Sequence, residues 1–341
     1  MKKITYLLCL FLIHAGISMG QDIHFSAMDY SPLTLNPALA GANKDLSATV
    51  HYRKQWNAVA SPYETIAGGA SIRLNNNKIK EQGILALGVN FYNDVAGLSK
   101  MTTNGGSLSF AYHLVLAKDH FLGLGLQGGF GSRSIGVNDG RWGNQYNGTE
   151  YDPTISGENF GSPSFSYFDA NAGLVYSYHP TNNSRNNNGT NLNIGLAAYH
   201  LSQPNYSFIQ SEDENLYIRL SAFAMAQIGI NDSKTAIEPQ LIAQFQGPSI
   251  ETLLGTDFRF FLSESRGGKS KTSVALGAFW RNRDALMTRF SVQFSGVDIG
   301  LVYDFNIFND LQSISNSKGA FEVFLRYGMN FSKSGFKTRF R

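Results

Sequence analysis

Hydrophobic and polar side chains alternate along most of the chain with a period of two residues. In the segment 216–230 every even position is apolar, whereas the odd positions include Arg219, Ser221 and Gln227. Successive side chains of a β-strand point to opposite faces, so this period predicts strands with one apolar face. We count fourteen such segments, at 47–56, 63–74, 83–92, 104–116, 121–134, 165–179, 191–201, 215–230, 234–246, 251–263, 272–283, 287–295, 297–306 and 319–331.

The length of these segments and the placement of their charges favour a membrane barrel. Many are longer than the five or six residues of an ordinary strand and match a tilted membrane strand of about 9–11 residues. An Arg or Lys facing mid-bilayer lipid costs about 2–4 kcal/mol, so charges should face the lumen. The charged residues with that parity include Arg53, Arg73, Arg219, Asp257, Arg259, Arg289, Asp298, Asp304, Glu322 and Arg326. Only Lys54 and Glu64 have the outward parity, and both lie at strand ends.

The predicted fold is therefore all-β, a transmembrane antiparallel β-barrel of about 14 strands with an N-terminal plug segment. A soluble β-sandwich or a propeller is the alternative, but its strands would be shorter. The connections agree with a barrel, because those after even strands are mostly short or polar, such as 117–119 and 295–296. The longest ones, 135–164 and 202–215, follow odd strands, as expected of outer loops opposite periplasmic turns. The polar connection 180–191 is an exception to this asymmetry.

Composition and charge define the compartment and exclude one class of partner. Residues 1–20 combine Lys2 and Lys3 with an apolar run and then small residues, which predicts a cleaved secretory signal, with a membrane anchor as the alternative. Cys9, the single cysteine, lies inside that run, so the mature chain has none. Two of the 28 basic residues are removed with the signal, which leaves 26 basic and 25 acidic residues. The net charge is then close to zero, which does not indicate a nucleic-acid-binding protein. We expect the barrel at 46–331 and a basic periplasmic tail at 332–341, either a frayed terminus or a docking peptide.

The segment "QDIHFSAMDYSPLTLNPALAG", residues 21–41, is apolar, yet Pro32 and Pro37 prevent a regular helix or a central strand. A barrel of fourteen strands is wider than one that side chains alone can fill. Irregular backbone is tolerated inside such a barrel but not in lipid. We therefore expect residues 21–45 to plug the lumen from the periplasmic side, with an inward-folded 135–164 loop as the alternative plug.

Several short motifs resemble the PorP/SprF family. They are "FS" at 25–26, "LNPALAG" at 35–41, "YRKQW" at 52–56, "SPYET" at 61–65, "NDVAGLS" at 93–99 and "FAYHLVL" at 110–116. The resemblance implies a FadL-like fourteen-stranded barrel with an Asn-Pro-Ala element in its plug. The expected plug residues are Phe25, Tyr30, Leu35, Asn36, Pro37, Ala38 and Gly41. The chain lacks the Cys-Pro-Arg ending that is common in the family.

The resemblance also implies a function. Members belong to the type IX secretion and gliding apparatus of the Bacteroidota outer membrane, where they partner a secreted adhesin-like cell-surface protein or a periplasmic lipoprotein or motor component. The alternative is a FadL-like transporter of hydrophobic small molecules. We expect the 135–164 loop to bind a partner through its aromatic residues, unless it is only a solvated cap. Those residues are Trp142, Tyr146, Tyr151 and Phe160.

Nothing in the sequence predicts catalysis, a cofactor or a metal. There is no HExxH, GxSxG or P-loop motif. Six of the seven histidines lie outside the signal, and no two of these have helical metal-ligand spacing. Asp139, Glu150 and Asp152 could hold Ca²⁺, but their spacing fits no EF-hand, and an ordinary polar loop is favoured.

Overall fold

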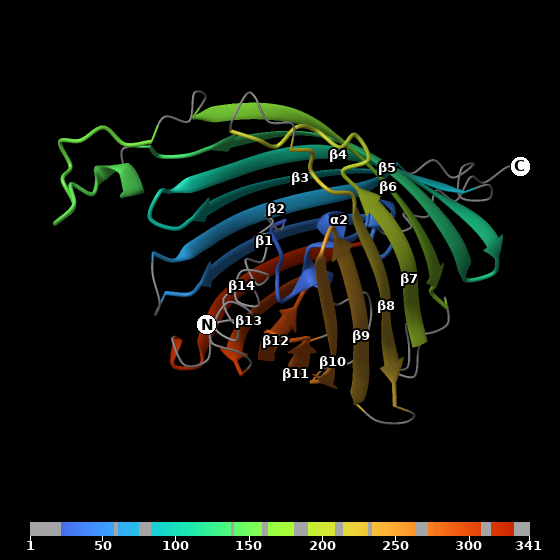
Figure 1. Ribbon diagram of the computed structural model, residues 1–341. Coiled ribbons are helices and arrows are strands. Elements are labelled where there is room, and N and C mark those ends of the chain that lie inside the picture. Colours follow the sequence, from blue (N-terminus) through green and yellow to red (C-terminus); the bar gives the residue numbers. More distant parts are fainter. Residues whose placement is uncertain are drawn as a thin grey trace, which may run out of the picture.

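Fourteen strands form a closed antiparallel barrel in which each strand pairs with its neighbours in sequence and β14 pairs with β1 (Figure 1). The computed structural model describes residues 22–57, 61–74, 83–137, 140–158, 163–180, 190–208, 214–230, 234–262, 272–307 and 315–330. The strands are β1 (Leu46–Gln55), β2 (Tyr63–Leu74), β3 (Ile84–Ala96), β4 (Met101–Ala117), β5 (His120–Ser134), β6 (Ser164–Tyr178), β7 (Thr190–Tyr199), β8 (Arg219–Gly229), β9 (Thr235–Gln246), β10 (Ser249–Phe261), β11 (Ser273–Arg281), β12 (Ala285–Phe294), β13 (Val297–Asn306) and β14 (Lys318–Met329).

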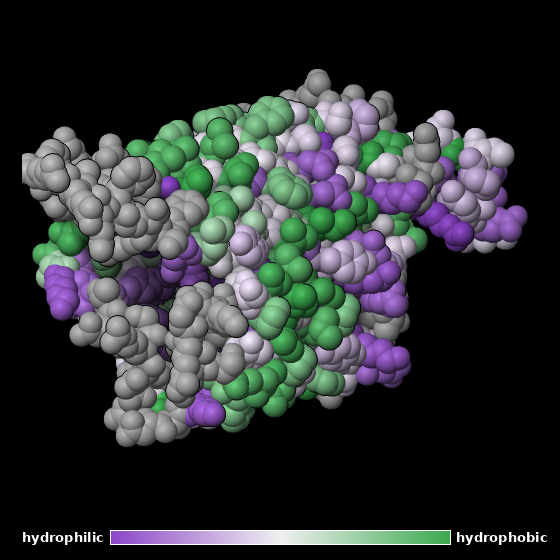
Figure 2. Space-filling model, turned by 180° about the vertical axis from the view of Figure 1, so that it is seen from behind, coloured by the Kyte–Doolittle hydropathy of each residue, from purple (hydrophilic) through white to green (hydrophobic). Residues whose placement is uncertain are grey.

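Each of the fourteen predicted segments overlaps one of these strands, with ends that differ by up to four residues, so the predicted fold is confirmed. The predicted facing is confirmed too. In β12, Met287 and Arg289 are buried, whereas Leu286 and Phe290 are exposed. Hydrophobic side chains cover much of the outer wall in Figure 2. This surface is the one expected to meet lipid.

The outward charges at strand ends form an exposed pair. Lys54 Nζ lies 2.7 Å from Glu64 Oε1, on two strands that lie side by side. No helix in the described ranges is long and apolar enough to cross a membrane.

The two ends of the barrel differ. We call the end where odd strands lead into even ones the long-loop end, because it carries the connections 135–163 and 200–218. At the opposite end, the short-turn end, two of the turns are only 118–119 and 295–296. Residues 140–158, called the projecting loop, extend beyond the long-loop end as the green excursion in Figure 1. Their described part therefore does not fold into the lumen.

Residues 22–45, called the N-terminal segment, lie inside the ring of strands. Pro32 and Pro37 each sit at the start of a short helix, where a missing N–H costs nothing. The helices are η1 (Met28–Tyr30), α2 (Pro32–Leu35) and η2 (Pro37–Leu39). Their apolar side chains pack with lumen-facing residues of the strands into the main hydrophobic cluster. The hydrophobic core of this protein therefore lies in the lumen, between the N-terminal segment and the inward-facing side chains of the strands.

The direction of the N-terminal segment differs from the expected entry at the periplasmic side. Asp22 contacts Arg219, the first residue of β8, at the long-loop end. Asp45 pairs with Arg73, near the last residue of β2, at the short-turn end. The segment therefore crosses the whole lumen instead of entering from one side. Residues 1–20, 332–341, Phe160 and Asp139 lie outside the described residues.

Candidate functional site

The Asn-Pro-Ala element is seated on two glycines of the wall. Asn36 Nδ2 donates to the carbonyl oxygens of Leu174 and Leu196 at 3.0 and 2.9 Å. Its Oδ1 accepts from Ala38 N at 2.8 Å and so caps η2. A Cβ atom on Gly125 would lie 2.3 Å from Ala38 N, and one on Gly173 would lie 2.0 Å from Asn36 Oδ1. The element fits only because the wall has no side chain at these two positions.

A buried charge network holds the first turn of the segment. Ser26 Oγ donates to both Asp304 oxygens at 2.8 Å, and Ser26 N donates to Glu322 at 2.7 Å. Arg53 and Arg281 each donate to Asp304 Oδ2, at 3.1 and 2.8 Å. All four charged side chains are almost wholly buried. Such charges are tolerated only when they are paired, so the network fixes Ser26 as well as the wall.

Tyr30 is held by a second group of charges. Its ring stacks on Phe324 with centroids 3.8 Å apart, and its hydroxyl donates to Asp298 at 3.1 Å. The Arg326 guanidinium lies 4.1 Å from the ring centroid. Beside it, Asp29 accepts from Arg289 at 2.7 Å, and Arg289 also binds Asp257. Charges that the sequence assigned to the lumen thus make contact with the N-terminal segment.

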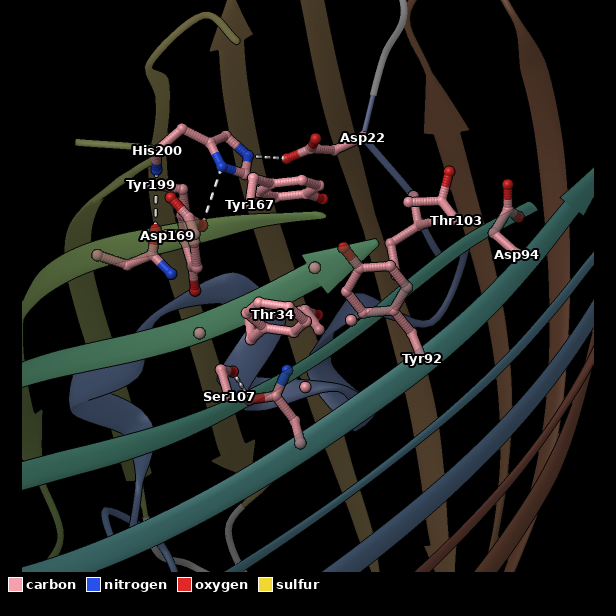
Figure 3. A pocket seen from close by; sticks show the side chains of 18 of the residues that line it. Asp22, Thr34, Tyr92, Asp94, Thr103, Ser107, Tyr167, Asp169, Tyr199 and His200 are labelled. Carbon is pink, nitrogen blue, oxygen red and sulfur yellow. Dashed lines mark hydrogen bonds and ion pairs between the residues drawn. The ribbon is translucent and has the colours of Figure 1, made fainter. Parts of the chain in front are cut away.

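His200, which sequence reasoning missed, binds the start of the segment. We call the group of His200, Asp22, Asp169 and Arg219 the clasp. His200 Nε2 lies 2.6 Å from Asp22, and its Nδ1 lies 3.0 Å from Asp169 (Figure 3). Arg219 Nε lies 3.2 Å from the same Asp22 carboxylate. Burial favours neutral imidazole, but the two carboxylates outweigh it and raise the pKa of His200 to about 9. Burial alone would raise the pKa of Asp22. The positive charges of His200 and Arg219 outweigh burial and hold this pKa well below its usual range.

A cavity of ≈ 200 Å³ lies beside this clasp, between the N-terminal segment and the wall from β3 to β8. Leu33 and Thr34 of α2 contribute to its lining, and so does Tyr206 from the connection 200–218. Figure 3 shows the rings of Tyr92, Tyr167 and Tyr199 around it. Sequence reasoning missed the cavity because its lining comes from six strands, the N-terminal segment and the connection 200–218.

The projecting loop carries three of the four predicted partner-binding aromatics. Trp142 is half-buried and packs inside its own loop, since its Nε1 donates to Val137 O at 2.6 Å. Tyr146 and Tyr151 are exposed and face each other across a β-bridge. The Arg141 guanidinium lies 5.0 Å from the Tyr151 ring centroid. The loop therefore offers two tyrosines and an arginine to solvent, whereas Trp142 stabilises the loop.

One of the candidate Ca²⁺ ligands, Asp152, has another role. Asp152 Oδ1 accepts from Thr154 N and Oγ1, at 2.8 and 2.6 Å, and so forms a local turn. Within the described ranges, no group of three His, Cys, Asp or Glu side chains could hold a metal ion.

Comparison with known proteins points to one family. The family described as "Type IX secretion system membrane protein PorP/SprF" matches residues 17–327. A Pseudomonas aeruginosa FadL homologue aligns with a TM-score of 0.46 and 9% identity, covering 86% of this chain and 93% of that one. The CymD monoaromatic hydrocarbon channel aligns with a TM-score of 0.46 and 12% identity, covering 92% and 95%. No curated protein matches the chain.

Proposed function

Because the chain belongs to the PorP/SprF family of type IX secretion system membrane proteins, we propose that this outer-membrane barrel works through protein partners. The partners are a secreted cell-surface protein at the long-loop end and a periplasmic lipoprotein or motor component at the short-turn end. Family and fold are those of a membrane component of secretion and not of an enzyme class.

The observation that carries the proposal is the projecting loop. Tyr146 is 58% exposed and Tyr151 36% exposed, on a loop whose internal hydrogen bonds maintain its shape. Rigid aromatic anchors among adaptable polar groups are common at protein-binding surfaces. A loop with that composition beyond the membrane surface suits capture of a secreted protein.

We further propose that the N-terminal segment seals the lumen. Phe25, Tyr30, Leu35 and Ala38 are all buried, and their neighbours bind both halves of the wall. A secretion component needs such a seal, because an empty barrel of this width would leak small solutes.

The partnership is tested by surface proteomics of cells that lack the protein. We expect loss of one or a few large surface proteins, restored by the wild-type chain but not by the double substitution Tyr146→Ser and Tyr151→Ser. Leu116→Ser, an exposed change on the barrel wall, serves as the control for altered surface chemistry. An unchanged surface proteome would contradict the proposal.

Sealing is tested separately, by uptake of a small hydrophilic dye into cells that carry a deletion of residues 22–41 after the signal. A heat-modifiable band on gels identifies the barrels that have assembled. Dye uptake by assembled deletion barrels is expected, and assembled barrels that stay tight would assign the seal to another segment.

Transport of a hydrophobic small molecule is the competing function. The described cavity fits it poorly, because Asn90, Asp94, Gln127 and Arg133 are among its lining residues. An apolar ligand there would leave polar groups without partners, at about 1–3 kcal/mol each. Lost uptake of a hydrophobic compound with an intact surface proteome would favour this function.

A further inference from the structure

The cavity beside the clasp is built from regular rows of side chains. Register places Asp94, Thr103 and Arg133 side by side on β3, β4 and β5. Two residues further from the long-loop end, the next row runs across β3, β4, β5 and β6: Tyr92, Gly105, Gly131 and Tyr167. The row beneath it consists of Asn90, Ser107, Gly129 and Asp169. These rows on four adjacent strands therefore form one wall of the cavity.

The second row makes an aromatic surface. A Cβ atom on Gly105 would lie 2.4 Å from the Tyr92 ring, and one on Gly131 would lie 2.3 Å from the Tyr167 ring. Each tyrosine thus lies over the glycine of the neighbouring strand, while both rings line the cavity. The face of an aromatic ring is electron-rich and packs well against weakly positive C–H groups.

The charges around the cavity balance each other. Three carboxylates line it, from Asp22, Asp94 and Asp169, and the cationic side chains are Arg133, Arg219 and His200. The clasp already pairs two of these carboxylates with His200 and Arg219. No net charge of the lining therefore selects a cationic or an anionic ligand.

Hydrogen-bonding capacity nevertheless remains in the lining. Asp94 Oδ1 accepts from Thr65 at 2.6 Å, which leaves its other oxygen available. Asn90 Oδ1 accepts from Ser107 and Gln127, while the Asn90 NH₂ has no partner in the described part of the chain. No carboxylate of the described residues lies within ion-pair distance of Arg133, whose guanidinium stacks 4.4 Å from the Tyr206 centroid. Hydroxyl groups, which both donate and accept, complement such a mixture.

The size of the cavity sets the size of the ligand. At ≈ 200 Å³ it exceeds the apolar cavity of about 150 Å³ that binds benzene in another protein. It has room for one six-membered ring with polar substituents. We propose that this cavity binds one uncharged, polyhydroxylated ring, a monosaccharide unit, presented from the long-loop end. The unit is either a free sugar or the end of a glycan carried by a surface lipid.

The test uses the full mature barrel in detergent, and saturation-transfer NMR with glucose, galactose, mannose and N-acetylglucosamine as probes. Toluene is the apolar probe, and lipopolysaccharide from the native outer membrane is the competitor. We expect at least one sugar to bind and toluene not to bind. Displacement by lipopolysaccharide assigns the site to a carried glycan, and no displacement assigns it to a free sugar; either supports a saccharide site.

Variants locate the binding. Asn90→Leu removes the available amide, and Gly129→Leu fills the third row, so each should weaken sugar binding at least tenfold. Ser221→Ala, a buried lumen-facing change outside the cavity lining, should leave binding unchanged. The heat-modifiable band shows which variants fold, and Asn90→Leu decides the matter if Gly129→Leu does not assemble. No binding of any sugar or of lipopolysaccharide by the folded wild type overturns the proposal, as does equal binding by folded Asn90→Leu.

Discussion

The N-terminal segment and the projecting loop are both irregular, but they keep their shape by opposite means. Ser26 in the segment bonds Glu322 and Asp304, which are 296 and 278 residues away. In the projecting loop, Gln145 bonds Trp142 and Ile155, only 3 and 10 residues away. The conformation of the N-terminal segment therefore depends on the barrel around it, whereas that of the projecting loop depends on contacts within the loop. A segment held by distant partners should move with the barrel, whereas a self-contained loop can change without affecting it.

The largest expected effect comes from Asp304→Ala. It leaves the buried guanidinium groups of Arg53 and Arg281 without their shared carboxylate, which should cost about 3–5 kcal/mol. We expect a lower melting temperature and less heat-modifiable barrel on gels. The matched change in the projecting loop, Asp152→Ala, removes only local hydrogen bonds and should stay within about 0.5 kcal/mol. Equal losses of stability from the two substitutions would contradict the view that the barrel holds the N-terminal segment whereas the projecting loop holds itself.

Gly125→Ala should separate the segment from the barrel. The new Cβ would press on Ala38 N and Pro37 C, and such overpacking costs about 1–3 kcal/mol. We expect the N-terminal segment to loosen while the strands stay paired. A cysteine introduced at Ile23 reports this by its labelling rate. Gly128→Ala in the same strand, where a Cβ meets only Phe168 at 3.7 Å, should label like the wild type.

The His200 clasp gives a smaller, pH-dependent effect. Its pKa lies above the ordinary value of 6.5, so its contribution is complete below pH 6.5 and is lost as pH rises through about 9. Asp22 acts in the opposite sense: its pKa is lowered, so its contribution is lost as pH falls below its ordinary 3.8.

The measurement is the labelling rate of a cysteine introduced at Ile23, divided by the rate of a cysteine introduced at Thr149 in the projecting loop. The division corrects for the pH dependence of thiol ionisation. This ratio should rise severalfold between pH 6.5 and pH 9.5. In His200→Gln it should be high and flat, and a wild-type ratio that is also flat would argue against the clasp.

The smallest effect on the barrel is expected from Gln145→Ala. It removes the hydrogen bonds that join Trp142 N and Ile155 O. Limited proteolysis should cut the projecting loop faster, while the melting temperature of the barrel stays unchanged. A drop like that of Asp304→Ala would show that the projecting loop is coupled to the wall.

The sequence alone determined the strands and their facing, because alternation is local and a charge on the lipid face is costly. Arg289 and Leu286 could be assigned to opposite faces from their parity alone. The breaks at Pro32 and Pro37 also indicated that residues 21–45 could not be a strand, and the width of the barrel suggested where they could lie.

The contacts between side chains inside the barrel could be known only from the folded structure. The register between neighbouring strands, from β3 to β6, places Tyr92, Gly105, Gly131 and Tyr167 in one row. It also brings Gly125 and Gly173 under the Asn-Pro-Ala element and His200 against Asp22. No local pattern encodes these pairs, because a period of two specifies a face but not a partner. Partners depend on the register between strands and on how the N-terminal segment packs against them.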